Sequence, residues 1–412
     1  MTVLIAGAGI GGLSTALMLH KRGIKSLVIE QAPEMREVGV GINTLPHSIA
    51  ELAELDLLDR LDEVGLRTRE LRYLTRMGQE VWRELRGTHA GHAHPQFSIH
   101  RGRLQKLLFD AVIERMGSDA VQTGRRLSGF VQDEGGVTAH FTSSTDGLSS
   151  STYRGEVLIC ADGIHSVGRR QFYPNEGAPS WPGVVMWRGA TEWPVWEDGE
   201  TMAIAGGLGG KLVLYPIAPA KNGTQLMNWV VNIRIKDPSV SPPPPESWSR
   251  RASLSNVLPY AKRFTVPGMD LEALVRGTDA IYEYPMADRD PLPRWTHGRV
   301  TLLGDAAHPM YPVGSNGSAQ AILDARCLAD NLAKAGHPRE ALYHYEQERL
   351  PKTAEVVRTN RLGGPERVID EVEKRSPQEF DDIDTVLSYA ERQAIVKGYA
   401  KMAGFGAKQA TK

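Results

Sequence analysis

The sequence predicts an α/β fold in which a mainly parallel sheet carries an inserted, mainly antiparallel β-sheet domain and is followed by C-terminal helices. Three observations indicate this fold. A strand–turn–helix–strand unit occupies the first thirty residues. Short apolar strands that run into glycine and aspartate recur at 156–161 and 299–303. Between them, residues 181–285 contain runs typical of antiparallel strands.

The first thirty residues form a complete dinucleotide-binding unit. The first strand runs into Gly7, Gly9 and Gly12, spaced as G-x-G-x-x-G, and a helix and a second strand follow. Gly7 permits a tight turn, Gly9 lets the backbone approach a pyrophosphate, and Gly12 lets helix and strand pack closely. Glu30 ends the second strand, where it can accept hydrogen bonds from a ribose. This pattern leaves open whether the dinucleotide is NAD or FAD.

The composition is that of an ordinary globular protein. The 412 residues carry a formal net charge of −1 and no long basic run, which argues against nucleic acid as a partner. No apolar run approaches the roughly 18 residues of a membrane span. Cys160 and Cys327 lie far apart in apolar stretches, as buried thiols do. Because the first strand begins at the second residue, we expect no signal peptide and a cytoplasmic protein.

Several segments before residue 120 predict local structure. Residues 46–61 are expected to form one helix, and residues 71–82 a hairpin around Gly78. Glycines at 39 and 41 permit close approach to a flat ring, although a plain loop is also compatible. The three histidines of 89–94 indicate a loop, since a metal site needs further ligands at rigid spacing, and no metal is expected.

Two further strand ends carry candidate ligands of a cofactor. Asp162 follows an apolar strand and precedes a short helix, so it could belong to a second cofactor-facing crossover or to a common turn. Asp305 follows the strand at 299–303, where it can hold a ribityl hydroxyl. The small-residue segment 314–318 opens a helix and can present N–H groups to an anionic ring edge. Residues 142–152 are expected to form a Ser/Thr/Gly-rich loop between two strands.

The inserted sheet is rich in aromatic residues. Five of the eight tryptophans fall within 181–229, so the sheet could line an apolar ring pocket, although packing explains most single tryptophans as well. Residues 206–210 are expected to form a hairpin instead of a phosphate loop, because no helix follows them.

Three motifs in order resemble the group A FAD-dependent aromatic hydroxylases, which share the para-hydroxybenzoate hydroxylase fold. They are the glycine turn at 7–12, the Asp162–Gly163 turn with Ser166 and Arg169, and the segment 304–309. Four further segments are similar to phenazine-1-carboxylate-type monooxygenases in particular: 39–43, 98–102, 186–189 and 284–293.

The resemblance implies a Rossmann-like (GR2-type) FAD-binding domain and assigns roles to individual residues. After Pro312, the family's usual Gly-Gln-Gly is here Gly-Ser-Asn-Gly. The FAD-binding residues would be Gly7, Gly9, Gly12, Glu30, Gln31, Gly41, Arg101, Leu127, Asp162, Asp305, Gly314 and Gly317. The predicted catalytic residues are Tyr215, Arg188 and Pro312, and the predicted substrate-contacting residues are Tyr73, Trp187 and Tyr284.

The resemblance also implies a division of the chain. The FAD-binding domain would comprise residues 1–72, 98–180 and 281–345. The substrate domain would comprise residues 73–97 and 181–280, and residues 346–412 would form a C-terminal helical segment.

The implied activity is hydroxylation of an aromatic or heteroaromatic acid, with or without decarboxylation. NADH or NADPH would reduce tightly bound FAD, and dioxygen would then form a flavin C4a-hydroperoxide. A monomer or homodimer is expected. Two other functions stay open: a reductase or dehydrogenase of the same fold without oxygen insertion, and a non-catalytic FAD-binding sensor.

Overall fold

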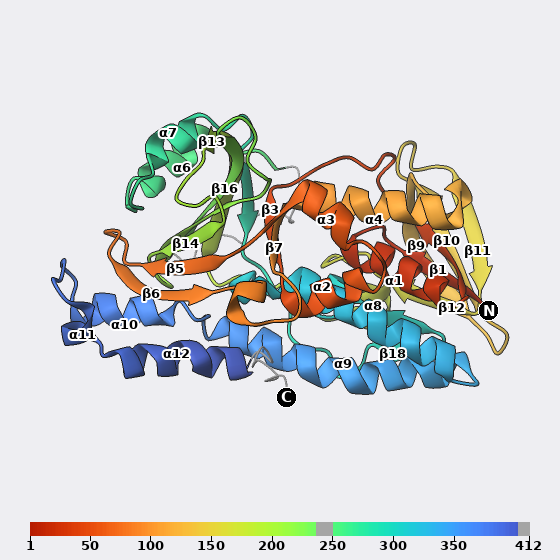
Figure 1. Cartoon of the computed structure of the whole chain (residues 1–412). Helices are drawn as coiled ribbons and strands as arrows, with labels where there is room; N and C mark the ends of the chain where they lie inside the picture. The colour runs from red at the N-terminus through yellow and green to blue at the C-terminus, as the bar shows by residue number, and fades with distance from the viewer. Residues whose placement is uncertain (236–249, 403–412) are drawn as a thin grey trace.

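A six-stranded sheet forms the centre of one half of the molecule (Figure 1). The fold is that of a computed structural model, which describes residues 1–235 and 250–402. All strands of this sheet except β18 run parallel, and their apolar runs are buried on both faces, as parallel sheets require. In sheet order the strands are β18 (Thr296–His297), β19 (Val300–Leu302), β12 (Val157–Cys160), β1 (Thr2–Ala6), β2 (Lys25–Ile29) and β8 (Val121–Gln122).

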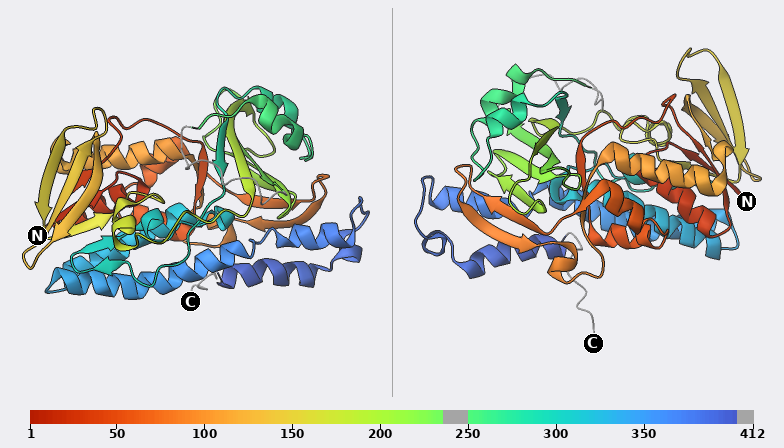
Figure 2. Two further views of the ribbon diagram at one scale, coloured as in Figure 1. Left: turned by 180° about the vertical axis from the view of Figure 1, so that it is seen from behind. Right: turned by 45° about the horizontal axis from the view of Figure 1, so that its top comes forward.

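Helices and a small sheet cover the two faces of the six-stranded sheet. Helix α1 (Ile10–Lys21) packs between α4 (Arg101–Met116) and α8 (Asn316–Lys334) on one face. The other face carries an antiparallel sheet of β9 (Arg125–Gln132), β10 (Val137–Ser143) and β11 (Ser150–Gly155), drawn in yellow in Figure 2. The prediction of a loop over 142–152 was therefore wrong in part. Alternate residues of β11 are exposed, so its Ser/Thr-rich composition suits an edge strand.

A seven-stranded sheet forms the second half of the molecule. It is antiparallel apart from the pairing of β14 with β5, which confirms the predicted sheet type. Helices α6 (Leu254–Ala261) and α7 (Leu271–Arg276) cover one face. In sheet order the strands are β17 (Tyr282–Pro285), β13 (Val184–Pro194), β16 (Thr224–Arg234), β15 (Gly210–Pro216), β14 (Thr201–Ala205), β5 (Glu70–Leu74) and β6 (Glu80–Leu85).

The C-terminal helices reach the opposite face of this sheet. Side chains of α10 (Arg367–Arg375) and α12 (Tyr389–Met402) pack against part of it. Helix α9 (Pro338–Arg361) runs along the base of the molecule towards them (Figure 2). The predicted domain boundary between residues 345 and 346 falls inside α9, because the apolar positions that pack against α8 continue across it.

Two segments between the halves have local features that the sequence did not predict. The single helix predicted over 46–61 is two helices, α2 (Pro46–Ala53) and α3 (Leu58–Val64), because Asp56 adopts a left-handed conformation with φ of 56°. A three-stranded antiparallel sheet, β3 (Gly41–Thr44), β7 (Phe97–His100) and β4 (Gly65–Arg67), lies next to them.

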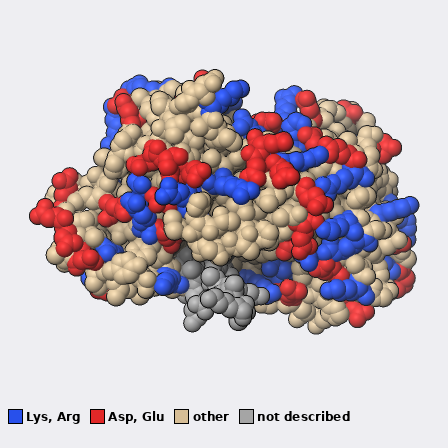
Figure 3. All heavy atoms as spheres, viewed as in Figure 1, with Lys and Arg blue, Asp and Glu red and all other residues tan. Residues whose placement is uncertain are grey.

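The surface has mixed charge. Basic and acidic side chains are interspersed over the face shown in Figure 3, in keeping with the formal net charge of −1. Within residues 1–235 and 250–402, no helix is both long enough and apolar enough to cross a membrane.

Candidate cofactor and substrate site

The glycine turn lies at the carboxyl end of β1 and leaves the start of α1 open. Gly7 has φ of 108°, and a Cβ atom there would be 2.5 Å from the carbonyl oxygen of Ala161. Gly9 caps α1 without a side-chain hydrogen bond, and a Cβ atom there would meet no atom within 4 Å among the residues described. The start of α1 therefore borders open space at Gly9, which suits the close approach of a diphosphate to the helix N-terminus.

Glu30 is anchored beside this turn. Its carboxylate accepts hydrogen bonds from the backbone N–H of Ala8 (2.6 Å) and of Ala32 (2.7 Å). These contacts hold the carboxylate at the end of β2, and its other lone pairs can accept from ribose hydroxyls. The adjacent Gln31 is exposed. Leu127 is buried in β9, a strand that begins where the N–H of Arg125 donates to the Glu30 carbonyl (2.8 Å).

Asp162 and Asp305 lie at the same edge of the sheet, because Cys160 of β12 pairs with Leu302 of β19. The backbone N–H of Val167 donates to Oδ2 of Asp162 (2.7 Å). Burial raises the pKa of both aspartates. Asp305 is nevertheless exposed to solvent, so a polar ligand can reach its carboxylate.

Arg101 is the first residue of α4 and lies near Asp305. Its backbone N–H donates to the carbonyl of Val40 (2.9 Å), and its side chain lies alongside Gly39. The positive charge of Arg101 acts to lower the pKa of Asp305, against the larger effect of burial. Arg101 and Asp305 are therefore close enough to influence one ligand.

Two buried charged residues support the turn that presents Asp305. Arg169 donates to the carbonyl oxygens of Ala307 (2.8 Å) and Ala306 (3.2 Å) and is also paired with Glu176. Asp324 of α8 accepts from the N–H of Gly304 (3.3 Å). The sequence singled out Arg169 as part of a motif, but its contact with the third motif becomes visible only in the fold.

The loop at the start of β3 is held by side chains of the seven-stranded sheet. The N–H of Gly41 donates to Oδ1 of Asn228 on β16 (2.8 Å), and a guanidinium N–H of Arg188 on β13 donates to the Gly41 carbonyl. A Cβ atom on Gly41 would be 2.7 Å from Cγ of Asn228 and from Ile217. Asn228 was not predicted from the sequence, where its only signal is an asparagine between buried apolar residues of a strand.

Arg188, Tyr215 and Asn228 share one face of the sheet. Tyr215 is paired with Asn228 across neighbouring strands, and paired residues point to the same face. Burial raises the pKa of Tyr215, while the charge of Arg188 and a hydrogen bond with it act in the opposite direction. These two predicted residues are therefore brought together, next to Gly41.

The predicted substrate residues do not all join this group. Trp187 points to the opposite face, where it stacks on Tyr260 of α6 with ring centroids 5.1 Å apart. Tyr73 is fully buried, and its hydroxyl donates to Glu84 (2.8 Å) on β6, at the far edge of the sheet. Tyr284 is buried on β17 and is paired with Met186 of β13.

The segment before α8 contains the remaining predicted site residues, Pro312, Gly314 and Gly317. Tyr311 and Val313 are buried against Met286, whereas Pro312 between them is exposed. Gly314 (φ 65°) and Ser315 (φ 58°) are both left-handed, which turns the chain into α8. Gly314 and Gly317 are partly exposed at this helix start, where N–H groups and the helix dipole favour an anionic edge.

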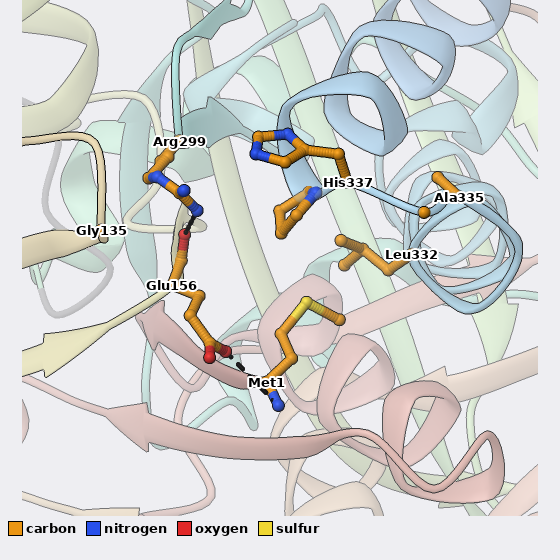
Figure 4. A pocket seen from close by; sticks show the side chains of 9 residues that line it. Met1, Gly135, Glu156, Arg299, Leu332, Ala335 and His337 are labelled. Atoms are coloured by element: carbon orange, nitrogen blue, oxygen red, sulfur yellow. Dashed lines mark hydrogen bonds and ion pairs between the residues drawn. The ribbon is translucent and has the colours of Figure 1, made fainter.

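A separate pocket of about 430 Å³ lies away from this site (Figure 4). Met1, Glu156 and Arg299 line it at the amino ends of the parallel strands. Ligands of open α/β sheets bind at the carboxyl ends of the strands, so this pocket is not where the dinucleotide fits. Among the described residues, no group of three or more His, Cys, Asp or Glu is placed to hold a metal ion.

The family of the chain follows from comparison with known proteins. A family model described as FAD binding domain matches residues 1–186 and 274–360. The chain belongs to the FAD binding domain family. This match confirms FAD as the predicted cofactor, and the glycine turn, Glu30, Asp305 and the start of α8 are chemically suited to it.

Proteins similar to this chain are named as hydroxylases and monooxygenases. The chain is 44% identical over 363 residues to phenazine 1,6-dicarboxylic acid hydroxylase PhzS of Lysobacter antibioticus, covering 87% of this chain and 89% of that protein. It is 31% identical over 370 residues to 3-hydroxybenzoate 6-hydroxylase 1 of Aquipseudomonas alcaligenes, covering 86% of each. The predicted aromatic hydroxylase family, and the predicted resemblance to a phenazine hydroxylase, are thereby confirmed.

Solved structures show the same fold. HpxO of Klebsiella pneumoniae, complexed with FAD and uric acid, superposes with a TM-score of 0.76 over 98% of this chain and 97% of that one, at 24% identity. This likeness confirms the predicted fold class.

Proposed function

We propose that the chain is a single-component FAD-dependent monooxygenase that hydroxylates a carboxylated, fused-ring aromatic substrate. The observation that carries this proposal is the match to the phenazine dicarboxylic acid hydroxylase along almost the whole of both chains. The cluster of Arg188, Tyr215 and Gly41 supports it, because polar side chains of the inserted sheet there contact the cofactor-side loop.

Residues of the first half would hold the cofactor. The start of α1 would bind the pyrophosphate, Glu30 the adenosine ribose, and Asp305 with Arg101 the ribityl region. The start of α8, with Gly314 and Gly317, would face the polar edge of the flavin ring, and Pro312 and Gly41 would flank that ring. When bound, FAD supplies the redox chemistry that activates dioxygen.

Residues of the sheet would orient the substrate. A tyrosine hydroxyl is protonated at neutral pH, and burial moves the pKa of Tyr215 further upward, so it would donate a hydrogen bond to an oxygen of the substrate ring. Arg188 would supply positive charge at the same place. Tyr284 would form part of the apolar wall, whereas Trp187 and Tyr73 would support the sheet from positions outside the pocket.

The electron donor, the oxidant and the location belong to the same proposal. NADH or NADPH would serve as a transient donor and dioxygen as the oxidant, in a cytoplasmic monomer or homodimer. The division of the chain into FAD-binding and substrate domains is retained, with the C-terminal boundary moved to the end of α9.

The decisive experiment measures NADH and NADPH oxidation and product mass with FAD-loaded protein and a panel of aromatic acids. The panel contains salicylate, hydroxynicotinate and phenazine-1-carboxylate. We expect one acid to accelerate oxidation of the nucleotide and to gain one oxygen atom. A product that also lost carbon dioxide would show decarboxylation.

Two results would favour the other functions. Reduction of an acceptor without oxygen in any product would indicate a reductase of the same fold. Binding of FAD without acid-dependent turnover of either nucleotide would indicate a sensor.

A further inference from the structure

The side-chain amide of Asn228 has its oxygen in a hydrogen bond and its nitrogen in none among the described residues. Its Oδ1 accepts from the N–H of Gly41 (2.8 Å), so the orientation of the side-chain amide is determined. Its Nδ2 is buried and has no hydrogen-bond partner among the described residues. A buried donor without an acceptor costs free energy, and a ligand that brings an acceptor oxygen recovers it.

The neighbouring Arg188 likewise has one donor group in a hydrogen bond and one buried donor group in none among the described residues. One terminal N–H of its guanidinium donates to the Gly41 carbonyl, while Nε is buried and without a partner in the part of the chain that the structure describes. The two side chains come from adjacent strands, β13 and β16, and meet at the same peptide segment. A neutral donor and a cationic donor side by side match the two oxygens of a carboxylate.

Bulk water cannot be the hydrogen-bond partner of Nδ2 of Asn228. Asn228 is fully buried and is flanked on its strand by the buried Met227 and Trp229. Its cross-strand neighbour on β15 is Tyr215, which faces the same side. The free donor thus lies beside the residue proposed to orient the substrate ring, and not at the outer surface.

We propose that Asn228 is a positioning residue that binds two partners at once: Oδ1 holds the Gly41 amide, and Nδ2, with Nε of Arg188, receives the carboxylate of the aromatic acid. This inference rests on the proposed function. It places the substrate carboxylate at Asn228 and Arg188. Because the same two side chains hold Gly41, the position of the Gly41 segment should depend on whether substrate is bound.

The test compares three variants in the FAD-loaded protein. Asn228→Asp retains an acceptor for the Gly41 amide but replaces the Nδ2 donor with a negative oxygen. Asn228→Ala removes both contacts. Asn232→Ala is the matched control, because Asn232 lies on the same face of the same strand, is 7% exposed and makes no contact with Gly41 in the residues described.

The measurements are dissociation constants for FAD, for phenazine-1-carboxylate and for phenazine-1-carboxamide. Binding of the carboxylate and of the carboxamide is followed by the change in the flavin absorption spectrum. For Asn228→Asp we expect FAD affinity within about twofold of wild type and carboxylate affinity reduced at least tenfold, with a smaller loss for the carboxamide. Asn228→Ala should weaken both FAD and carboxylate binding. Asn232→Ala should change neither by more than about threefold. Thermal unfolding confirms that each variant is folded.

The outcomes separate this inference from the function on which it rests. Wild-type protein that binds the carboxylate, together with an Asn228→Asp variant that binds it equally well, would overturn the inference and leave the function standing. Wild-type protein that neither binds any acid of the panel nor oxidises NADH or NADPH in its presence would overturn both. Equal losses in Asn228→Asp and Asn232→Ala would also contradict the inference, since they would indicate a general effect on the sheet.

Discussion

Gly12 lies directly against the carbonyl oxygen of Gly7: a Cβ atom on Gly12 would be only 2.0 Å from that oxygen. The oxygen belongs to the backbone of a tight turn between β1 and α1, so it cannot move aside without shifting the turn. The third glycine of the motif is thus required by packing, whereas Gly9 faces open space. The two glycines should respond differently to the same substitution.

We predict that Gly12→Ala lowers the free energy of unfolding of the FAD-free protein by about 1–3 kcal/mol or more, because it forces a backbone contact apart. Gly9→Ala should change it by less than about 0.5 kcal/mol. Gly9→Ala should still weaken FAD binding, since the pyrophosphate approaches that backbone. Thermal unfolding without FAD and fluorescence titration with FAD check both statements, and identical behaviour of the two variants would contradict them.

Lys211 of β15 and Glu366, just before α10, form an ion pair, so we expect strong coupling between their contributions to the free energy of unfolding. Glu366 is 2% exposed, so removal of its partner leaves a buried charge. Lys211→Met should cost about 3–5 kcal/mol, and Lys211→Met combined with Glu366→Leu should cost clearly less than the sum of the single changes. Denaturant unfolding measures this cycle. Lys106→Met, which breaks an exposed pair with Asp110, is the control and should cost less than about 1 kcal/mol.

His47 on α2 should make stability depend on pH. Burial lowers its pKa to about 4, and the charge of Arg349 acts in the same direction. The unfolded chain therefore binds more protons between pH 6.5 and 4, so stability is complete above pH 6.5 and falls as the pH drops through that window. The loss is about 3 kcal/mol at most, and less in practice because burial is incomplete.

His47→Gln should flatten the plot of Tm against pH between 6.5 and 4. The exposed His140 offers a matched control, and His140→Gln should leave the slope of wild type unchanged. A slope in His47→Gln equal to that of wild type would show that other groups cause the acid sensitivity.

We expect substitution of Tyr215 to affect activity and substitution of Tyr73 to affect stability. Tyr215→Phe removes the hydroxyl beside Arg188 and should lower kcat by about 10- to 100-fold with little change in FAD affinity or Tm. Tyr73→Phe removes a hydrogen bond to Glu84 outside the site and should lower Tm without changing kcat. Steady-state kinetics with the acid found active in the panel, together with thermal unfolding, would show whether the two effects separate in this way.

Much of the cofactor half could be predicted because its signals are local. Gly7, Glu30 and Asp305 each follow a short apolar strand, and neighbouring parallel strands bring such ends together. The break at Asp56 was missed, since the left-handed conformation of an aspartate has no sequence signature apart from the residue type.

The substrate half was harder to predict because both faces of its sheet are covered. Apolar residues therefore occur on both faces of β13, and alternation cannot tell whether Arg188 or Trp187 faces the cofactor. Asn228 was missed for a second reason: its partner Gly41 is 187 residues away, on another sheet. Contacts of this kind depend on how the two halves pack together, which a local sequence pattern cannot predict.

Helix α9 has a consequence for how the molecule unfolds. Near its middle, Glu346 accepts hydrogen bonds from the N–H groups of Trp295 and Thr296 beside the six-stranded sheet. At its end, Asn360 donates to the Tyr311 carbonyl (3.1 Å), and Arg361 is paired with the buried Asp288, close to the second sheet. The same helix is thus hydrogen-bonded to a strand of the six-stranded sheet and paired with a residue that closely follows the last strand of the second sheet. The two halves should therefore melt in one cooperative transition, with equal calorimetric and van't Hoff enthalpies, despite their different architectures.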